Sequence, residues 1–122
     1  MSRVVLWAAV GALGGAGAVA RFLLDGAVAS RTRAALPLGT LVVNLSGAFA
    51  LGLLTGAALR GDALLLAGTA TLGSYTTFST WMLETQRLGE DGSYAVMAVN
   101  VVASLACGVG AAALGRALGG AL

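Results

Sequence analysis

The sequence predicts an all-α membrane protein with four transmembrane helices, and three observations support this fold class. Of the 122 residues, 58% are hydrophobic and only 10% are charged, and the mean hydropathy is +0.92, which is more apolar surface than a soluble domain of this size can bury. The charged residues fall at a few positions and leave four long uncharged stretches between them. These stretches are continuous runs rich in Gly, Ala and Leu rather than alternating strands, so helices are the expected spanning structure.

The four uncharged stretches define the predicted spans. A helix needs roughly 20 residues to cross a hydrocarbon layer of about 30 Å. The spans are therefore expected at about residues 4–24, 37–59, 63–86 and 93–115, in a single domain of residues 1–122. Pro37, the only proline, marks the start of the second helix, where its missing N–H is not needed. The first stretch also fits a cleaved signal peptide, because an apolar run follows Arg3 and small residues follow the run.

Short connections, at about residues 25–36, 60–62 and 87–92, predict that neighbouring helices run antiparallel. The arginines then divide almost evenly between the two sides, with Arg3, Arg60 and Arg116 on one and Arg21, Arg31, Arg33 and Arg87 on the other. Such a balance gives no positive-inside bias, so the chain is expected to insert in both orientations unless a partner imposes one. Small residues spaced four apart, at Gly11 and Gly15, Gly52 and Gly56, and Ser104 and Gly108, predict close helix contacts and an oligomer.

Composition argues against several other classes of protein. The chain has no histidine and a net charge of +2, which is too sparse for a nucleic-acid surface. The single cysteine, Cys107, lies in the middle of a span and is expected to be a small packing residue.

The third span carries the strongest functional signal. From Gly73 to Trp81 it holds a glycine, five serines and threonines, and three aromatic residues. Gly, Ser and Thr weaken a regular helix, so this run predicts a break near residues 73–77, where released carbonyl oxygens can hold a cation. A simple kink capped by hydroxyl groups is the alternative.

Further along the same span, Phe78 and Trp81 are three residues apart and share a helix face. Aromatic rings have a positive edge, so the two rings are candidates to line an anion path, although ordinary packing explains such spacing as well. Glu84, one turn beyond, is expected at the end of that path or at the membrane interface.

The second and fourth spans each carry a polar stripe. Thr40 and Asn44 are one turn apart, and Asn100, Ser104 and Gly108 repeat every four residues. Facing each other, the stripes would form a groove whose amides and hydroxyls replace the water of an anion, or they hydrogen-bond between helices. Arg21, at the end of the first span, either snorkels to the surface or concentrates anions at a pore mouth.

In four segments, in order along nearly the whole chain, the sequence resembles the Fluc (CrcB) fluoride channel family. The matching residues are Gly14, Gly15, Gly17 and Arg21; then Pro37, Gly39, Thr40, Asn44, Gly47, Phe49 and Gly52; then Gly73, Thr76, Thr77, Phe78, Ser79, Thr80 and Glu84; and finally Asn100 and Ser104. The third segment is the most specific of the four.

This resemblance implies an antiparallel, dual-topology homodimer with two pores and a third helix broken near its middle. It implies a structural Na+ at the dimer centre, held by the carbonyl oxygens of Gly73 and Thr76. The expected function is passive export of fluoride across the cell (inner) membrane, without catalysis, by a multi-pass protein whose partners are fluoride, the lipid bilayer and a second copy of itself. The expected ion pathway comprises Arg21, Thr40, Asn44, Phe78, Ser79, Thr80, Trp81, Glu84, Asn100 and Ser104.

Two positions depart from the family pattern: Trp81 stands where phenylalanine is usual, and Gly108 stands where a hydroxyl residue is frequent. Pairing with a paralogue instead of a second copy is compatible with the same sequence. The main rival function is a small multidrug exporter, which protonates a carboxylate in its first span; in this chain Glu84 is the only candidate for that role. A structural or assembly subunit is a second rival.

Overall fold

The structure is a computed structural model that describes residues 1–122. All of its regular elements are helices: α1 (Arg3–Arg31), α2 (Leu38–Gly56), α3 (Gly61–Leu64), the π-helical segment η1 (Leu65–Leu72), α4 (Gly73–Tyr75), α5 (Ser79–Glu90) and α6 (Tyr94–Gly120). Three of them, α1, α2 and α6, are long and apolar enough to cross a membrane. The predicted all-helical class is therefore confirmed, and three of the four predicted spans are found as single long helices.

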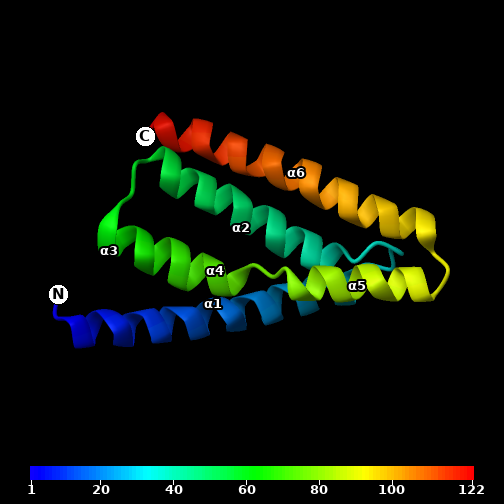
Figure 1. Cartoon of the computed structure of the whole chain (residues 1–122), viewed down its shortest axis with the longest axis horizontal. Coiled ribbons are helices and arrows are strands. Elements are labelled where there is room, and N and C mark those ends of the chain that lie inside the picture. The colour runs from blue at the N-terminus through cyan, green and yellow to red at the C-terminus, as the bar shows by residue number, and fades with distance from the viewer.

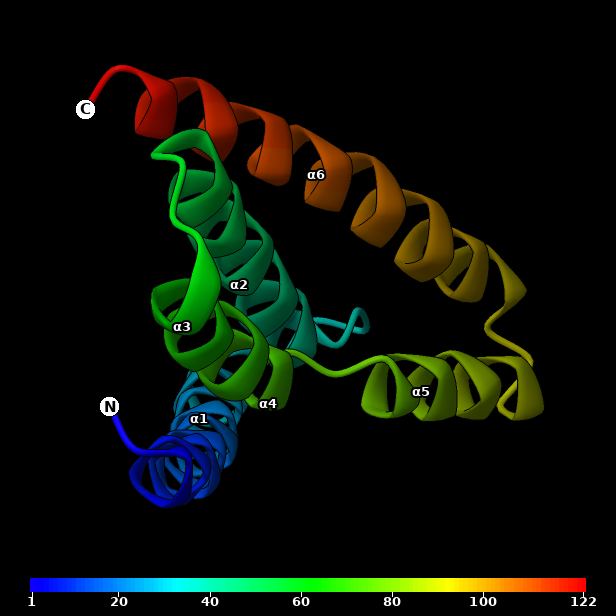
Figure 2. The same ribbon diagram turned by 60° about the vertical axis from the view of Figure 1, so that its left-hand side comes forward.

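The third segment of the bundle is composite. Helices α3, η1 and α4 follow one another without a gap and form one rod, and α5 begins only after the non-helical residues 76–78 (Figure 1). Within η1 the helix is wound more widely, and the Thr71 hydroxyl donates to the carbonyl of Leu66, five residues earlier, at 2.7 Å. Figure 2 shows α5 leaving the other rods and running toward the start of α6.

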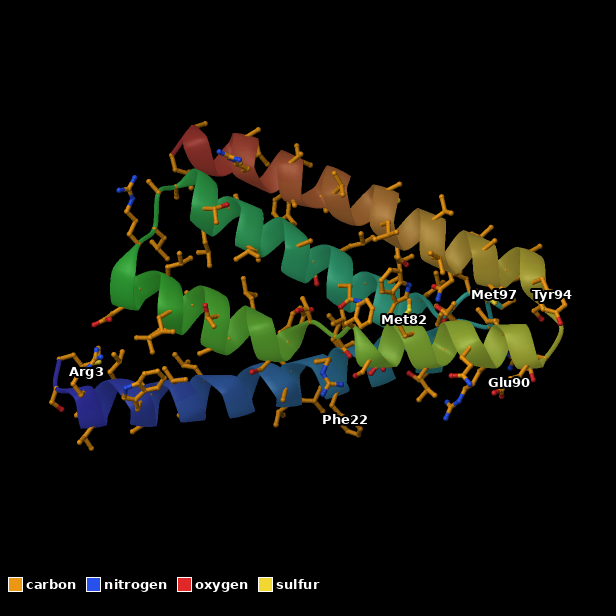
Figure 3. All side chains as sticks on the ribbon, in the orientation of Figure 1. Arg3, Phe22, Met82, Glu90, Tyr94 and Met97 are labelled. Carbon is orange, nitrogen blue, oxygen red and sulfur yellow. The ribbon has the colours of Figure 1, made fainter.

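The rods alternate in direction along the long axis of the molecule. Both termini and the turn before α3 lie at one end of the bundle (Figure 1). Arg3 lies at that end, whereas Glu90 and Tyr94 lie at the opposite end (Figure 3). Neighbouring rods therefore run antiparallel, as the short connections predict.

Four helix ends differ from the expected spans, because α1, α5 and α6 run on to Arg31, Glu90 and Gly120, and α2 stops early at Gly56. Helix α1 continues through the region predicted as a connection to Arg31, whose guanidinium donates to the Ala27 carbonyl at 3.1 Å. The reason is local, since the residues after Gly26 include good helix formers and no proline, so charge at Asp25 does not end the helix. Helix α2 ends at Gly56, earlier than residue 59, because Ala58 takes a left-handed conformation with φ of 60°.

Contact between α2 and α6 depends on glycine. A Cβ at Gly52 would clash with the carbonyl oxygen of Ala112, and one at Gly115 would clash with the carbonyl of Phe49. Gly56 and Gly119 approach the opposite backbone in the same way. These four residues form the glycine seam, in which two backbones touch directly, as the spacing of Gly52 and Gly56 predicts.

The glycines of the other predicted small-residue pairs have open space where a side chain would lie. A Cβ added at Gly11, Gly15 or Gly108 would meet nothing within 4 Å. Helix α1 instead packs through Gly17, whose Cβ would clash with the Thr71 carbonyl. Few side chains are buried in the chain, and large apolar residues such as Phe22 point outward (Figure 3), which fits a lipid environment.

Candidate functional site

A groove with a volume of about 500 Å³ opens between α2, the composite third rod, α5 and α6. Four of the predicted pathway residues line it: Asn44 from α2, Phe78 from the helix break, Trp81 from α5 and Ser104 from α6. The two predicted cation-binding residues, Gly73 and Thr76, also line it. The remaining pathway residues lie outside its lining: Arg21, Thr40, Ser79, Thr80, Glu84 and Asn100.

The Asn44 side chain pairs with the backbone of the helix break. Its Nδ2 donates to the Thr77 carbonyl at 2.9 Å, and its Oδ1 accepts from the Thr77 N–H at 2.9 Å. The amide therefore satisfies both backbone groups of a residue that has left the regular helix. This is the interhelical hydrogen bonding that sequence reasoning weighed as an alternative, yet the Nδ2 group has a second N–H that this pair does not use.

The Thr77 side chain also bonds to the first turn of the helix that follows the break. Its hydroxyl accepts from the Thr80 N–H at 3.1 Å and donates to the Thr80 hydroxyl at 3.1 Å. A hydroxyl that accepts from a backbone N–H in the first turn stabilises a helix start. Ser79 and Thr80 thus lie at the beginning of α5, beside the groove rather than in its lining.

The carbonyl oxygens of Gly73 and Thr76 accept no backbone hydrogen bond. In a continuous α-helix the N–H groups of Thr77 and Thr80 would donate to them. Here Asn44 accepts from Thr77, and the Thr77 hydroxyl accepts from Thr80. Two carbonyl oxygens at the break are therefore free to bind another electropositive partner. Carbonyl oxygens are the ligand type that a hard cation prefers.

The two aromatic rings of the groove pack edge to face. Phe78 and Trp81 have ring centroids 5.6 Å apart and an interplanar angle of 83°. Phe78 is 70% exposed, so this ring does not serve to fill a core within the chain. The positive edges of such rings suit an anion better than their faces do.

The indole N–H of Trp81 is already engaged, because it donates to the Asn100 carbonyl at 3.2 Å. The Asn100 side chain, which is 2% exposed, turns away from the groove and donates to the Thr85 hydroxyl at 2.9 Å. Sequence reasoning did not single out Thr85, although its position one turn after Trp81 on a polar helix was a signal that could have identified it.

Beyond one end of the groove, the buried Thr40 hydroxyl donates to a carboxylate oxygen of Glu84. Thr40 lies one turn before Asn44, and Glu84 lies one turn after Thr80, so this pair extends the polar track past the groove. Arg21 is partly exposed on α1 and does not reach this pair by a hydrogen bond. The arrangement leaves Glu84 hydrogen-bonded at the helix surface.

Apolar helices surround a helix break, and amide, hydroxyl and ring groups meet in one groove beside it. This combination defines a small integral membrane protein of the channel type. The family model described as "CrcB-like protein, Camphor Resistance (CrcB)" matches residues 8–116. The chain belongs to the CrcB family, which is a family of ion channels and not of enzymes.

Similar proteins cover the chain almost from end to end. A protein of Mycolicibacterium paratuberculosis named "Fluoride-specific ion channel FluC 2" is 56% identical over 97% of both chains. Proteins of the same name from Mycobacterium bovis and Haloarcula marismortui are 54% and 53% identical. The match with the Mycobacterium bovis protein covers 93% of this chain and 90% of the relative. The match with the Haloarcula marismortui protein covers 80% of each. The family resemblance seen in the sequence is confirmed.

Proposed function

We propose that the chain is a fluoride channel that passively lowers cytoplasmic fluoride by conducting the ion across the cell membrane. One observation carries the proposal: Asn44, Phe78, Trp81 and Ser104, from four parts of the chain, line one groove. The proposal also draws on a relative, 56% identical, that is named as a fluoride-specific ion channel.

The groove offers groups that can replace the water of a small anion. Moving an isolated ion into apolar surroundings costs tens of kcal/mol on idealised estimates. The second N–H of Asn44 and the hydroxyl of Ser104 are donors, and the edges of Phe78 and Trp81 supply weaker positive charge. Several weak sites in succession let an ion enter and leave, which a single tight site would prevent.

The free carbonyl oxygens at the helix break support a structural Na+. Gly73 and Thr76 would hold it through their backbone oxygens, and two antiparallel copies would supply four such oxygens around one ion. The bound ion would supply positive charge that neutralises the exposed carbonyl dipoles and fixes the break. Replacing Na+ by a large organic cation during reconstitution should then lower both fluoride flux and thermal stability.

We further propose an antiparallel homodimer with two pores in the inner membrane. The balanced arginines permit insertion in either orientation. Gly11, Gly15 and Gly108 leave helix surfaces without neighbours in the chain, where a second copy can approach closely. Net flux follows the fluoride gradient, so export results when cytoplasmic fluoride is the higher.

Purified protein in liposomes, with a fluoride electrode outside, tests the channel directly. We expect fluoride efflux without an energy source and far less chloride efflux. Full fluoride flux in the double variant Asn44→Ala and Phe78→Ala would contradict the assignment. Proton-coupled export of organic cations that disappears in Glu84→Gln would support the exporter instead, and absence of any flux would support an assembly role.

A further inference from the structure

Three hydrogen bonds join Trp81, Thr85 and Asn100 in a closed ring between α5 and α6, called here the indole network. The Trp81 indole N–H donates to the Asn100 carbonyl at 3.2 Å. The Asn100 Nδ2 donates to the Thr85 hydroxyl at 2.9 Å, and that hydroxyl donates to the Trp81 carbonyl at 2.7 Å. Asn100 and Thr85 are only 2% and 9% exposed, so the network is shielded from competing donors.

The network occupies the only hydrogen-bond donor of the indole. An indole has a single N–H donor and no acceptor. Because that donor is bound to α6, it is not available to an ion in the groove. Trp81 therefore presents the C–H groups of its ring to the groove, and the ring is in edge-to-face contact with Phe78.

The same network determines how the ring is held. A phenyl ring in this position would have no polar anchor and could turn about its own axis. The indole is instead fixed through its nitrogen to the Asn100 carbonyl on α6, and the Asn100 side chain is itself held by the Thr85 hydroxyl on α5. Helix α5 is thus tied to α6 by this network, in addition to its link to α2 through the bond from the Thr40 hydroxyl to Glu84.

We propose that Thr85 and Asn100 are positioning residues that act through Trp81, fixing the indole so that its carbon-bound edge, and not its N–H, faces the ion path. The effect on conduction rests on the proposed function, but the immobilisation of the ring does not. A carbon-bound edge attracts an anion more weakly than an N–H donor does, which favours passage over retention.

Fluorescence of Trp81 tests the immobilisation. The chain has two tryptophans, and Trp7, 56% exposed on α1, lies outside the groove. Trp7→Phe therefore leaves Trp81 as the only indole, and its time-resolved anisotropy reports ring motion. We expect more fast motion in Thr85→Val and in Asn100→Ala, and little change in Thr85→Ser, which keeps the hydroxyl. Unchanged ring motion in both of the first two variants would overturn the proposal.

Fluoride flux tests the coupling to conduction. Thr85→Val leaves the buried Asn100 amide without a partner, and we expect a roughly fivefold loss of flux. In a Trp81→Phe background, where there is no indole to position, the same substitution should change flux by less than about twofold. Equal losses in both backgrounds would show that Thr85 acts on folding alone and would overturn the positioning role. If the unaltered protein conducts no fluoride, the channel assignment fails, while the anisotropy still decides whether the network holds the indole.

Discussion

The glycine seam and the helix break solve opposite problems within the same small bundle. In the seam, α2 and α6 touch because side chains are missing, and backbone lies on backbone. At the break, backbone groups have lost their helical partners and the Asn44 amide and the Thr77 hydroxyl replace them. Without water as a solvent, stability comes from close approach in the first region and from hydrogen bonding in the second. The seam is therefore the region for stability, and the break is the region for function.

Of the substitutions that test this comparison, one in the glycine seam should have the largest effect. Gly115→Ala places a methyl group against the Phe49 carbonyl and should lower the free energy of unfolding by about 1–3 kcal/mol. Thermal unfolding in detergent measures it. Gly110→Ala on the same helix is the matched control, because a Cβ there meets nothing within 4 Å. Equal stability of the two variants would mean that the seam does not depend on its glycines.

Asn44→Asp should have the next largest effect, mainly on conduction. The carboxylate can still accept from the Thr77 N–H, but it cannot donate to the Thr77 carbonyl, and its charge repels anions. We expect a loss of at least about tenfold in fluoride flux from liposomes, given the added negative charge and the cost of leaving a part-buried carbonyl without its donor. Ser46→Ala is the control, since Ser46 lies on the same helix and bonds to Val43 and Tyr75 away from the groove. Similar losses in both variants would remove the distinction between the regions.

Thr77→Val should have a smaller effect at the break. Loss of the bond from the Thr80 N–H should cost about 1 kcal/mol of stability, as for other helix-start hydroxyls. Thermal unfolding measures the cost. Thr55→Val provides the comparison, because the Thr55 hydroxyl bonds only to carbonyls of its own helix, at Leu51 and Gly52. A larger loss at Thr55 than at Thr77 would argue against a structural role for the capping hydroxyl.

Arg21→Gln should have the smallest effect, because Arg21 belongs to neither region. A charge near a pore mouth raises the local concentration of anions, and salt screens it. We expect about a twofold drop in fluoride flux at low ionic strength and no difference at high ionic strength. A loss that persists in high salt would instead indicate direct contact between Arg21 and the ion.

Much of the fold could be predicted from the sequence, because lipid makes the rules simple. Long uncharged runs predict helices, and the cluster from Gly73 to Trp81 drew attention to the segment where α4 ends and α5 begins. The extension of α1 to Arg31 was missed because charges mark the limits of a span and not those of a helix.

The partners within the site could not be predicted in the same way. Asn44 meets Thr77, 33 residues away in sequence, and Asn100 meets Thr85, 15 residues away. Such pairs depend on how far one rod slides and turns against another, which no local pattern specifies. Polar residues in a span predict that partners exist but do not identify them.

The π-helical segment η1 is followed by the short helix α4 and then by the break, and it sets the rotation of both. Each residue in a regular helix advances the side-chain direction by about 100°, so the wider winding of Leu65–Leu72 turns Gly73 and Thr76 away from where an α-helix would have pointed them. The segment thus changes the direction in which residues point around the helix axis, between a rod that packs on α1 and a break that opens to the groove. The number of residues in it, more than their chemical type, decides on which side of the rod the free carbonyl oxygens emerge.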